Sequence, residues 1–224
     1  MIKAILFDLN GTMIDDMDYH TKAWFDILNN DLEAGLSWEE VKKEMYGKNV
    51  ELLVRVFGDK RFTMDEMNEL SVEKERRYQK EFFPQLKLIN GLDAFLKEAS
   101  SKEIKMAIAS AAIPFNVDFV LDNLNIRDLF GAVVSADDVK TSKPHPETFL
   151  KAGALLNTDP SDCIVFEDAP KGVEAALNAG MDAVVLTTMH EREEFDQYPN
   201  VIAFVKDYTD PFFRQLLKNE AKYA

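Results

Sequence analysis

The sequence predicts an α/β protein whose doubly wound parallel sheet carries an inserted, all-helical cap. Short and nearly continuous apolar runs alternate with longer helical patterns over most of the chain, as expected for strands that are buried on both faces of a parallel sheet. The exception is the segment after the first run, where apolar residues recur mainly at helical spacing. Strand–helix alternation with one helical insertion indicates a Rossmann-type core and one smaller module.

Six apolar runs are the predicted strands of the core. They are residues 4–7, 106–109, 132–135, 163–166, 183–186 and 203–205. Between the later runs, apolar spacing of three and four predicts helices over residues 116–124, 146–156 and 172–179. We expect the core to comprise residues 1–14 and 88–224.

The predicted cap covers residues 15–87. Its helical patterns are residues 24–28, 38–45, 51–57 and 64–82. Ser37 with Glu40, and Thr63 with Glu66, have the spacing of capping boxes that begin two of these helices. The charge-dense segment 73–77 is expected to be a solvated face of the last helix.

Composition narrows the classes of function. The chain has 224 residues, 46% hydrophobic and 29% charged, with a formal net charge of −14. This charge argues against a nucleic-acid or anionic-membrane partner, and any phosphate site must supply its own local positive charge. The single cysteine, Cys163, lies in an apolar run and is expected to be buried. No export signal or membrane span is visible in the sequence, so we expect a cytoplasmic protein, and a monomer.

Polar residues follow four of the predicted strands. Asp8 follows the first, Ser110 the second, Lys143 lies beyond the third, and Glu167 with Asp168 follows the fourth. In an open parallel sheet, ligands bind beyond the carboxyl ends of the strands. These side chains are therefore expected to converge on one edge of the sheet.

The residue types at this edge suit phosphate chemistry. Mg²⁺ prefers oxygen ligands, which Asp8, Asp168, Glu167 and a main-chain carbonyl near Asn10 could provide. Lys143 would add positive charge. Ser110 and the N–H groups of the turn Leu9, Gly11 and Thr12 could hold phosphate oxygens. Asp8 could then attack phosphorus and form an acyl phosphate.

These residues resemble the four motifs of the haloacid dehalogenase (HAD) superfamily. Asp8 to Thr12 is similar to the first motif, Ser110 to the second, Lys143 to the third and Glu167-Asp168 to the fourth. The inserted helical segment resembles the C1-type cap of the β-phosphoglucomutase-like branch, including Asp15, His20 and Trp24. The resemblance implies a HAD-like core and a Mg²⁺-dependent enzyme. Its nucleophile would be Asp8, its phosphate-orienting groups Ser110 and Lys143, and its metal-organising acids Glu167 and Asp168.

One position departs from the family pattern. The resemblance implies that the second acid of the first motif gives a proton to the leaving group and then takes one from water. This chain has Asn10 at that position. General acid/base help is worth about 10²- to 10⁴-fold. The backbone carbonyl of Asn10 could still ligate a metal. The chain could therefore be a slow enzyme, an engineered trap, or an enzyme in which another group such as His20 replaces the acid. His20 could equally be a packed cap residue beside Trp24.

The substrate is left more open by the sequence. Lys48 in the cap and Ala111 behind Ser110 are expected to contact it. The mutases of the branch have a basic residue before the cap-loop glycine and an arginine three residues after it, where this chain has Tyr46 and Val50. The leading hypothesis is thus a phosphohydrolase of a small phosphorylated metabolite. A β-phosphoglucomutase-type phosphotransferase and a phosphate- or metabolite-binding protein without turnover are the alternatives. A phosphonate hydrolase fits less well, because no single lysine of the cap stands out. A dehalogenase fits less well, because the acids of the fourth motif favour a metal.

Overall fold

The computed structural model describes residues 2–218 of the chain. A six-stranded, all-parallel sheet forms the core, in the order β3-β2-β1-β4-β5-β6. Its strands are β1 (Ala4–Phe7), β2 (Lys105–Ala109), β3 (Ala132–Val134), β4 (Cys163–Glu167), β5 (Asp182–Leu186) and β6 (Val201–Val205). The chain winds outward from β1 in both directions, first to β2 and β3 and then, on the other side of β1, to β4, β5 and β6. The strand order therefore reverses at β1, and such a switch point opens a crevice at the carboxyl edge of the sheet. The predicted fold class is confirmed.

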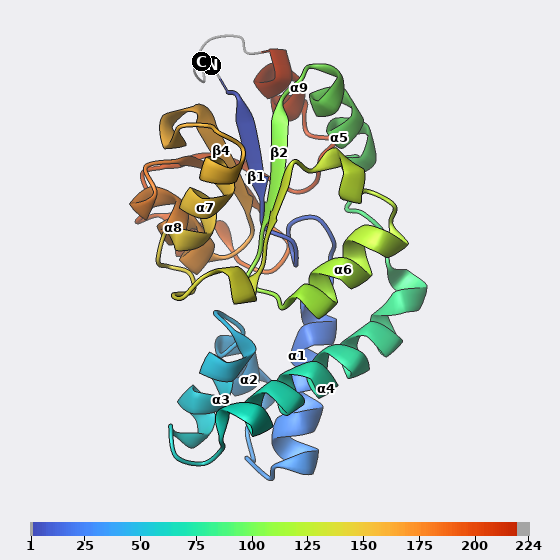
Figure 1. Ribbon diagram of the computed structural model, residues 1–224, viewed down its shortest axis with the longest axis vertical. Coiled ribbons are helices and arrows are strands. Elements are labelled where there is room, and N and C mark those ends of the chain that lie inside the picture. The colour runs from blue at the N-terminus through green and yellow to red at the C-terminus, as the bar shows by residue number, and fades with distance from the viewer. Residues whose placement is uncertain (1, 219–224) are drawn as a thin grey trace.

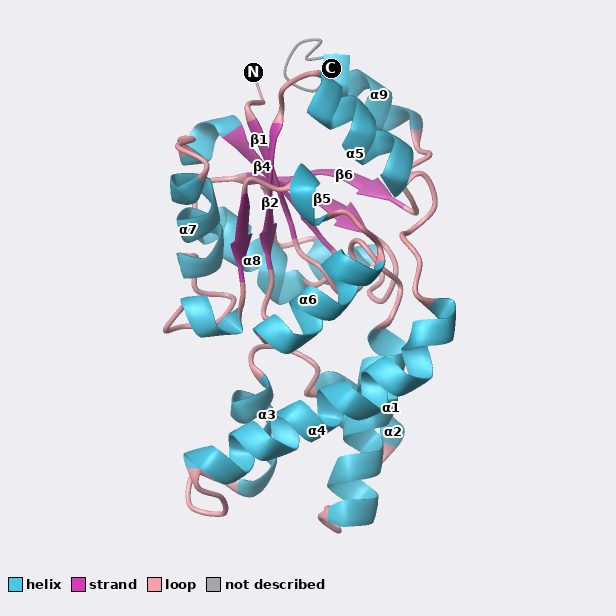
Figure 2. Ribbon diagram, turned by 45° about the vertical axis from the view of Figure 1, so that its right-hand side comes forward, coloured by secondary structure: helices cyan, strands magenta, loops and turns pink. Residues whose placement is uncertain are grey.

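Helices cover both faces of the sheet (Figures 1 and 2). One face carries α5 (Leu92–Ser101), α6 (Pro114–Asn123) and α9 (Pro211–Lys218); the other carries α7 (Glu147–Leu155) and α8 (Pro170–Asn178). Strand alternation explains the division, because successive side chains point to opposite faces. Ile5 and Phe7 pack under the first group, and Ala4 and Leu6 under the second.

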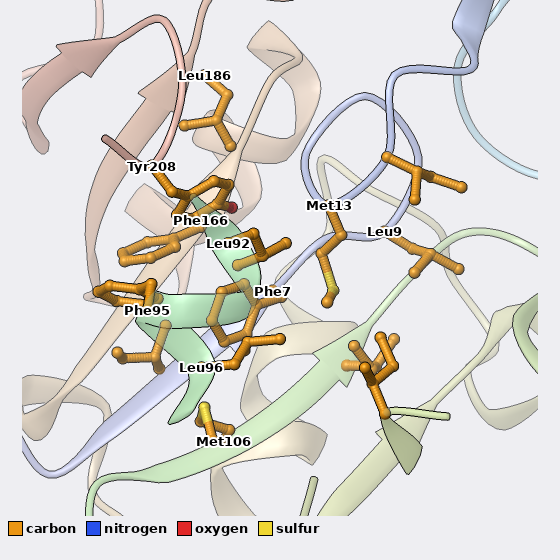
Figure 3. Close-up of a cluster of buried hydrophobic side chains, with 14 of the residues drawn as sticks. Phe7, Leu9, Met13, Leu92, Phe95, Leu96, Met106, Phe166, Leu186 and Tyr208 are labelled. Atoms are coloured by element: carbon orange, nitrogen blue, oxygen red, sulfur yellow. The ribbon is translucent and has the colours of Figure 1, made fainter. Parts of the chain in front are cut away.

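Aromatic side chains pack among aliphatic ones in the core on the face of α5 and α9 (Figure 3). The ring of Phe7 lies edge-on to Phe95 and Phe166, with centroid distances of 6.4 and 5.0 Å. The Tyr208 hydroxyl donates a hydrogen bond of 3.0 Å to the carbonyl of Thr12. This contact ties the core to the loop that follows β1. On the other face, Cys163 is buried as predicted.

The segment after β1 is helical (lower part of Figure 1). It contains α1 (Met17–Asp26), a π-helical turn (Ile27–Asp31), α2 (Trp38–Lys43), α3 (Asn49–Phe57) and α4 (Met64–Phe82). Both predicted capping boxes are present, at Ser37 with Glu40 and at Thr63 with Glu66. A separate apolar cluster around Trp24, Leu28 and Leu53 packs these helices together. We call this helical segment the cap.

Two features differ from the sequence-based expectations. Helix α1 begins at Met17 rather than near Trp24. Apolar spacing did not predict its first turns, because they carry Asp18 and His20 instead of apolar residues. Helices α5 and α9 were not predicted, although Leu92, Phe95, Leu96 and Ala99 are buried at helical spacing. Short 3-10 turns connect other elements, at Phe83–Gln85, Arg127–Leu129, Ala136–Asp138, Pro160–Asp162 and Arg192–Phe195. Over residues 2–218, no helix has the length and apolar character needed to cross a membrane.

Candidate active site

A cleft lies between the carboxyl edge of the sheet and the cap. It encloses about 850 Å³, a volume that includes its open mouth. Core residues Asp8, Ser110, Lys143, Glu167 and Asp168 line it, and so do Ala111 and Asn10. The cap contributes His20, Lys48, Lys74 and Glu75. The residues predicted to converge from distant parts of the chain therefore do share one cleft.

Lys143 bridges two carboxylates at the core side of the cleft. Its Nζ atom donates hydrogen bonds to Asp8 Oδ1 at 2.6 Å and to Glu167 Oε1 at 2.7 Å. All three residues are buried. Burial lowers the pKa of the Lys143 ammonium, but the two carboxylates outweigh burial and hold that pKa above its ordinary value. The side chain therefore remains a fixed positive charge between the acids.

The same neighbours act on Asp8. Burial raises the pKa of its carboxyl, Lys143 lowers it, and the charge of Glu167 raises it, so that the pKa lies at about 7. For Asp168, burial and the charges of Glu167 and Asp8 raise the pKa well above its ordinary value. One lysine thus balances only part of the charge that three buried carboxylates would carry when ionised.

Two glycines make room for these acids. Gly11 has a φ of +75°, and a Cβ atom there would lie 2.1 Å from Asp168 Oδ2. At Gly172, on the first turn of α8, a Cβ atom would lie 1.8 Å from Glu167 Oε1. The other oxygen of Glu167 accepts hydrogen bonds from the backbone N–H groups of Asp168 and Ala169, both at 2.9 Å. The backbone therefore packs directly against both acids of the fourth motif.

The turn after β1 differs from the simplest expectation for a phosphate cradle. Leu9 and Thr12 are fully buried, and neither they nor Gly11 line the cleft. The Gly11 N–H donates to the Ile14 carbonyl at 2.8 Å, and the Thr12 hydroxyl donates to Asp168 Oδ1 at 3.3 Å. Substrate contact by this turn stays a prediction.

Cap and core meet through two polar contacts near Lys143. Lys48 Nζ donates to the Val139 carbonyl at 2.6 Å. The Ser142 hydroxyl donates to Glu51, with both carboxylate oxygens within 2.7 Å. On the core side, Ser110 Oγ accepts a hydrogen bond from the Ala112 N–H at 3.1 Å. Lys48 is therefore placed at the cleft but engaged with the core.

Asn10 lies where the core loop meets the first cap helix. Its Nδ2 atom donates to Asp16 Oδ2 at 2.6 Å and lies 2.8 Å from His20 Nε2. The Tyr78 hydroxyl donates to the same Asp16 oxygen, and the His20 ring stacks on Tyr78 with 3.7 Å between centroids. Burial and the Asp16 charge raise the pKa of Tyr78, so its hydroxyl stays protonated and acts as a donor. His20 is thus packed and also adjacent to Asn10.

The expectation that residues 73–77 form a solvated face is wrong for two of them. Lys74 and Glu75 are 3% and 1% exposed and face the cleft. Lys74 Nζ contacts His20 Nδ1 and lies 3.0 Å from Glu75 Oε1. The missed signal is helical register, because Met67, Ser71, Tyr78 and Phe82 place one buried stripe along α4 that includes position 74. Asp16 was also missed. Two consecutive acids before a helix, Asp15 and Asp16, are typical of a helix N-terminus and do not by themselves indicate a functional site.

Among residues 2–218, no three acidic, histidine or cysteine side chains are already gathered in a metal-coordination arrangement. The Lys143 ammonium occupies the space between Asp8 and Glu167. The donor set nevertheless consists of carboxylate oxygens, which are the ligands of hard cations, and the charge on the three acids exceeds that of the one lysine. The residues present therefore fit a divalent cation by chemistry.

A parallel sheet with a helical cap over its carboxyl edge, and a lysine-bridged pair of acids between them, defines a capped enzyme with a doubly wound α/β core. A family profile described as haloacid dehalogenase-like hydrolase matches residues 5–186. The chain belongs to this family, and the predicted resemblance to its β-phosphoglucomutase-like branch is confirmed.

Individual relatives have different activities. The chain is 33% identical over 198 residues to the β-phosphoglucomutase of Bacillus subtilis, covering 82% of each chain. It is 29% identical over 182 residues to a fructose-1-phosphate phosphatase of Escherichia coli, covering 81% of this chain and 94% of that one. The crystal structure of a β-phosphoglucomutase from Clostridium difficile superposes with a TM-score of 0.82 at 28% identity, covering 98% of both chains. The prediction that the chain is an enzyme of this superfamily is confirmed.

Proposed function

We propose that this protein is a Mg²⁺-dependent phosphohydrolase that acts on a small phosphorylated metabolite through an aspartyl-phosphate on Asp8. The observation that carries the proposal is the Lys143 bridge between Asp8 and Glu167, at 2.6 and 2.7 Å. It lies in the cleft between the carboxyl edge of the sheet and the cap. The phosphatases among the relatives support the same reaction class.

The proposed metal ligands are Asp8, Asp168 and the backbone carbonyl of Asn10, with Glu167 held by Lys143 as a supporting acid. The partly unbalanced charge of the three buried carboxylates supports this assignment. A bound Mg²⁺ would neutralise charge on the transferring phosphoryl group and on the attacking carboxylate.

The reaction proceeds in two displacements. In the first, an Asp8 oxygen attacks phosphorus while the bond between phosphorus and the ester oxygen breaks. The leaving oxygen takes up a proton and departs as an alcohol. In the second, water attacks phosphorus, the bond to Asp8 breaks, and phosphate leaves. Lys143 holds Asp8 in position and offsets negative charge, while Ser110 is placed to hold a phosphate oxygen.

Asn10 is expected to limit both displacements. Its amide cannot give a proton to the leaving group or take one from water at neutral pH, and help of that kind is worth about 10²- to 10⁴-fold. The closest groups that could assist are His20, with Nε2 2.8 Å from Asn10 Nδ2, and Asp16. The proposal therefore predicts slow turnover rather than none.

Hydrolysis is favoured over a mutase reaction, because a mutase must hold a second phosphate in the cap. Three basic groups of the cap, of which Lys48 and Lys74 line the cleft, are engaged within the protein. Lys48 binds the Val139 carbonyl, Arg55 pairs with Glu44 at 2.6 Å, and Lys74 pairs with Glu75.

The test is a panel of phosphate esters, assayed with and without Mg²⁺ on the wild-type protein and on Asp8→Asn. We expect Mg²⁺-dependent release of phosphate that Asp8→Asn abolishes. After an acid quench, mass spectrometry should find phosphate on the peptide that contains Asp8. If neither turnover nor phosphorylation is found but phosphate esters bind, the protein is a metabolite-binding member of the family and the hydrolase proposal is wrong.

A further inference from the structure

Asn10 is followed by Gly11, and an Asn-Gly pair is the sequence in which asparagine loses its side-chain amide most readily. The backbone nitrogen of the glycine attacks the side-chain carbonyl carbon, Cγ, and no Cβ atom of the glycine hinders its approach. Water then opens the succinimide ring that has formed. The chain contains two such pairs, Asn10-Gly11 and Asn90-Gly91. The folded protein surrounds them with different groups.

The carboxylate of Asp16 contacts both nitrogen atoms that this reaction involves at Asn10. Its Oδ1 atom accepts a hydrogen bond of 3.2 Å from the Gly11 N–H, the group that must lose its proton in order to attack. Its Oδ2 atom accepts one of 2.6 Å from Asn10 Nδ2, the atom that must gain a proton in order to leave. A carboxylate only accepts hydrogen bonds, so it holds the amide with the NH₂ group toward itself. One base therefore contacts the attacking and the leaving nitrogen.

Asp16 is fixed in this position, whereas Asn10 is open to water. Asp16 is 1% exposed, and its Oδ2 atom also accepts from the Tyr78 hydroxyl and lies 3.1 Å from His20 Nε2. Asn10 is half-buried and lines the cleft, so water reaches its side chain.

Asn90 lacks this arrangement although its sequence context is the same. It is exposed, and its Nδ2 atom donates to Asp207 Oδ2 at 3.2 Å. The other oxygen of Asp207 accepts from the Thr209 N–H at 2.8 Å, so this carboxylate does not bridge to the nitrogen of Gly91. Asn90 therefore serves as an internal reference for Asn10.

We propose that Asn10 is a self-modification site, at which the folded protein converts its own asparagine to aspartate with Asp16 as the general base. In the first step the Gly11 nitrogen forms a bond to Asn10 Cγ and its proton passes to Asp16. The bond between Cγ and Nδ2 breaks, and Nδ2 takes the proton from Asp16 and leaves as ammonia. In the second step water adds its hydroxyl to Cγ, the bond from Cγ to the Gly11 nitrogen breaks, and that nitrogen takes the remaining proton. The product is an aspartate with an unchanged backbone.

The product would place a second carboxyl group beside Asp16, and two acids this close share one proton. That consequence rests on the proposed hydrolase, in which a proton at position 10 serves the leaving group, but the modification itself does not. The chain would then be synthesised in a slow form and mature to a faster one.

The first test needs no mutation. Protein from a short cell-free synthesis is sampled over time near neutral pH, native and unfolded in urea, and peptide mass spectrometry follows both Asn-Gly pairs. General base help is worth about 10²- to 10⁴-fold, but the Gly11 N–H must give up its 2.8 Å hydrogen bond to the Ile14 carbonyl, a loss of about tenfold.

In the native protein Asn10 should therefore deamidate about tenfold or more faster than in the unfolded chain, and Asn90 should show no such acceleration. Aspartate should exceed isoaspartate at position 10. A native rate at Asn10 equal to or below the unfolded rate, or isoaspartate as the main product, would overturn the self-modification.

The second test assigns the acceleration to Asp16. Asp16→Asn keeps the shape of the side chain but removes the base, and deamidation at Asn10 should slow about tenfold or more. Asp15→Asn is the matched control, because Asp15 is the neighbouring acid and is exposed. Circular dichroism checks that both variants fold; if Asp16→Asn does not, the comparison of native and unfolded wild type decides alone. A folded Asp16→Asn that deamidates at the wild-type rate contradicts the role of Asp16.

Activity separates the modification from the hydrolase. The kcat of the timed wild-type samples should rise with the fraction of molecules deamidated at Asn10, toward the value of Asn10→Asp. If Asn10 is converted but neither these samples nor Asn10→Asp turns over any ester, the modification stands and the hydrolase is wrong. If esters are turned over but Asn10 keeps its amide, the hydrolase stands and the modification is wrong.

Discussion

The side chain of Asn10 donates a hydrogen bond of 2.6 Å to the carboxylate of Asp16. A carboxylate therefore lies beside the position where the family pattern has an acid and this chain has an amide. Asp16 is 1% exposed and also accepts from the Tyr78 hydroxyl and from the Gly11 N–H. This one side chain joins the loop after β1 to α1 and α4, which are elements of core and cap.

Asn10→Asp should increase the turnover of phosphate esters by about 10²- to 10⁴-fold, the range of general acid/base catalysis. The introduced carboxyl would lie beside Asp16, and two carboxyl groups this close hold one proton between them. That shared proton is what the leaving group needs. The measurement is kcat with Mg²⁺ for both proteins on the same ester.

Asn123→Asp is the control for the change from amide to acid, because Asn123 is exposed at the end of α6 and does not line the cleft. A rate for Asn10→Asp no higher than for wild type would mean that another group, such as His20, already transfers the proton. Rates of both proteins below detection would count against the hydrolase itself.

Asp16→Ala should destabilise the protein by about 1–3 kcal/mol for each buried donor that it leaves unsatisfied. It leaves the buried Tyr78 hydroxyl and the Asn10 amide without their acceptor. Asp15→Ala is the matched control, because Asp15 is the neighbouring acid and is exposed. Urea unfolding of the two variants measures the difference, and equal midpoints would show that the Asp16 network adds no stability.

Lys143→Met should reduce kcat/KM by about 10²- to 10³-fold, as expected when a preorganised electrostatic group is removed from a site. Asp8 and Glu167 would then face each other without the cation that now bridges them. The control is Lys151→Met, which removes a partly exposed lysine that lies outside the cleft and pairs with Asp138 at 3.3 Å. Activity in Lys143→Met equal to that in Lys151→Met would remove Lys143 from the proposed site.

Gly172→Ala should weaken Mg²⁺ binding by about 10- to 100-fold, the usual effect of disturbing a group that supports metal ligands. The new methyl group would overlap Glu167 Oε1, which accepts from Lys143, and Glu167 would have to move. Gly153→Ala is the control, because Gly153 also lies in a helix of the core, α7. A Cβ atom there would lie 3.4 Å from its nearest neighbour, the Thr158 carbonyl oxygen. The concentration of Mg²⁺ needed for half-maximal thermal stabilisation should rise only in Gly172→Ala.

Local patterns were enough to predict the strands and the longest cap helix. The run of Ala4 to Phe7 is apolar on both faces because both faces are buried, and α4 begins at Met64 because Thr63 and Glu66 form its capping box. The buried charges of α4 were not predictable in the same way. Charged residues are usually solvated, and the burial of Lys74 and Glu75 depends on their mutual ion pair and on the tertiary contacts of α4 with His20 and Asn49.

The same distinction holds for the active site. Four motifs in order predicted which side chains share the cleft, because parallel strands end at one edge of a sheet. They did not reveal that the cap returns a carboxylate, Asp16, to the side chain of Asn10. That contact depends on how α1 enters the cap, which is a matter of packing rather than of local sequence.

The metal-free protein should become less stable as the pH rises from about 4 to about 7, between the unfolded and the folded pKa of Asp8. The folded-state pKa of Asp8 is raised from 3.8 to about 7, and that of Asp168 is raised as well. Below the unfolded pKa both states hold the proton; between the two values only the folded state keeps it. Stability from this source is therefore fully present at low pH and is lost as the pH rises through the folded pKa, by about 1.4 kcal/mol per pH unit for one fully linked group.

Thermal unfolding in EDTA across this range measures the slope, and Asp8→Asn isolates the contribution of Asp8, since the general repulsion expected from a net charge of −14 acts on both proteins. The slope should be shallower in Asp8→Asn. Mg²⁺ should raise Tm more at about pH 8 than at about pH 5, because a metal must displace the bound protons at the lower pH. A Tm in EDTA that rises over this range, or equal slopes in the two proteins, would mean that Asp8 releases its proton as readily in the folded state as in the unfolded chain.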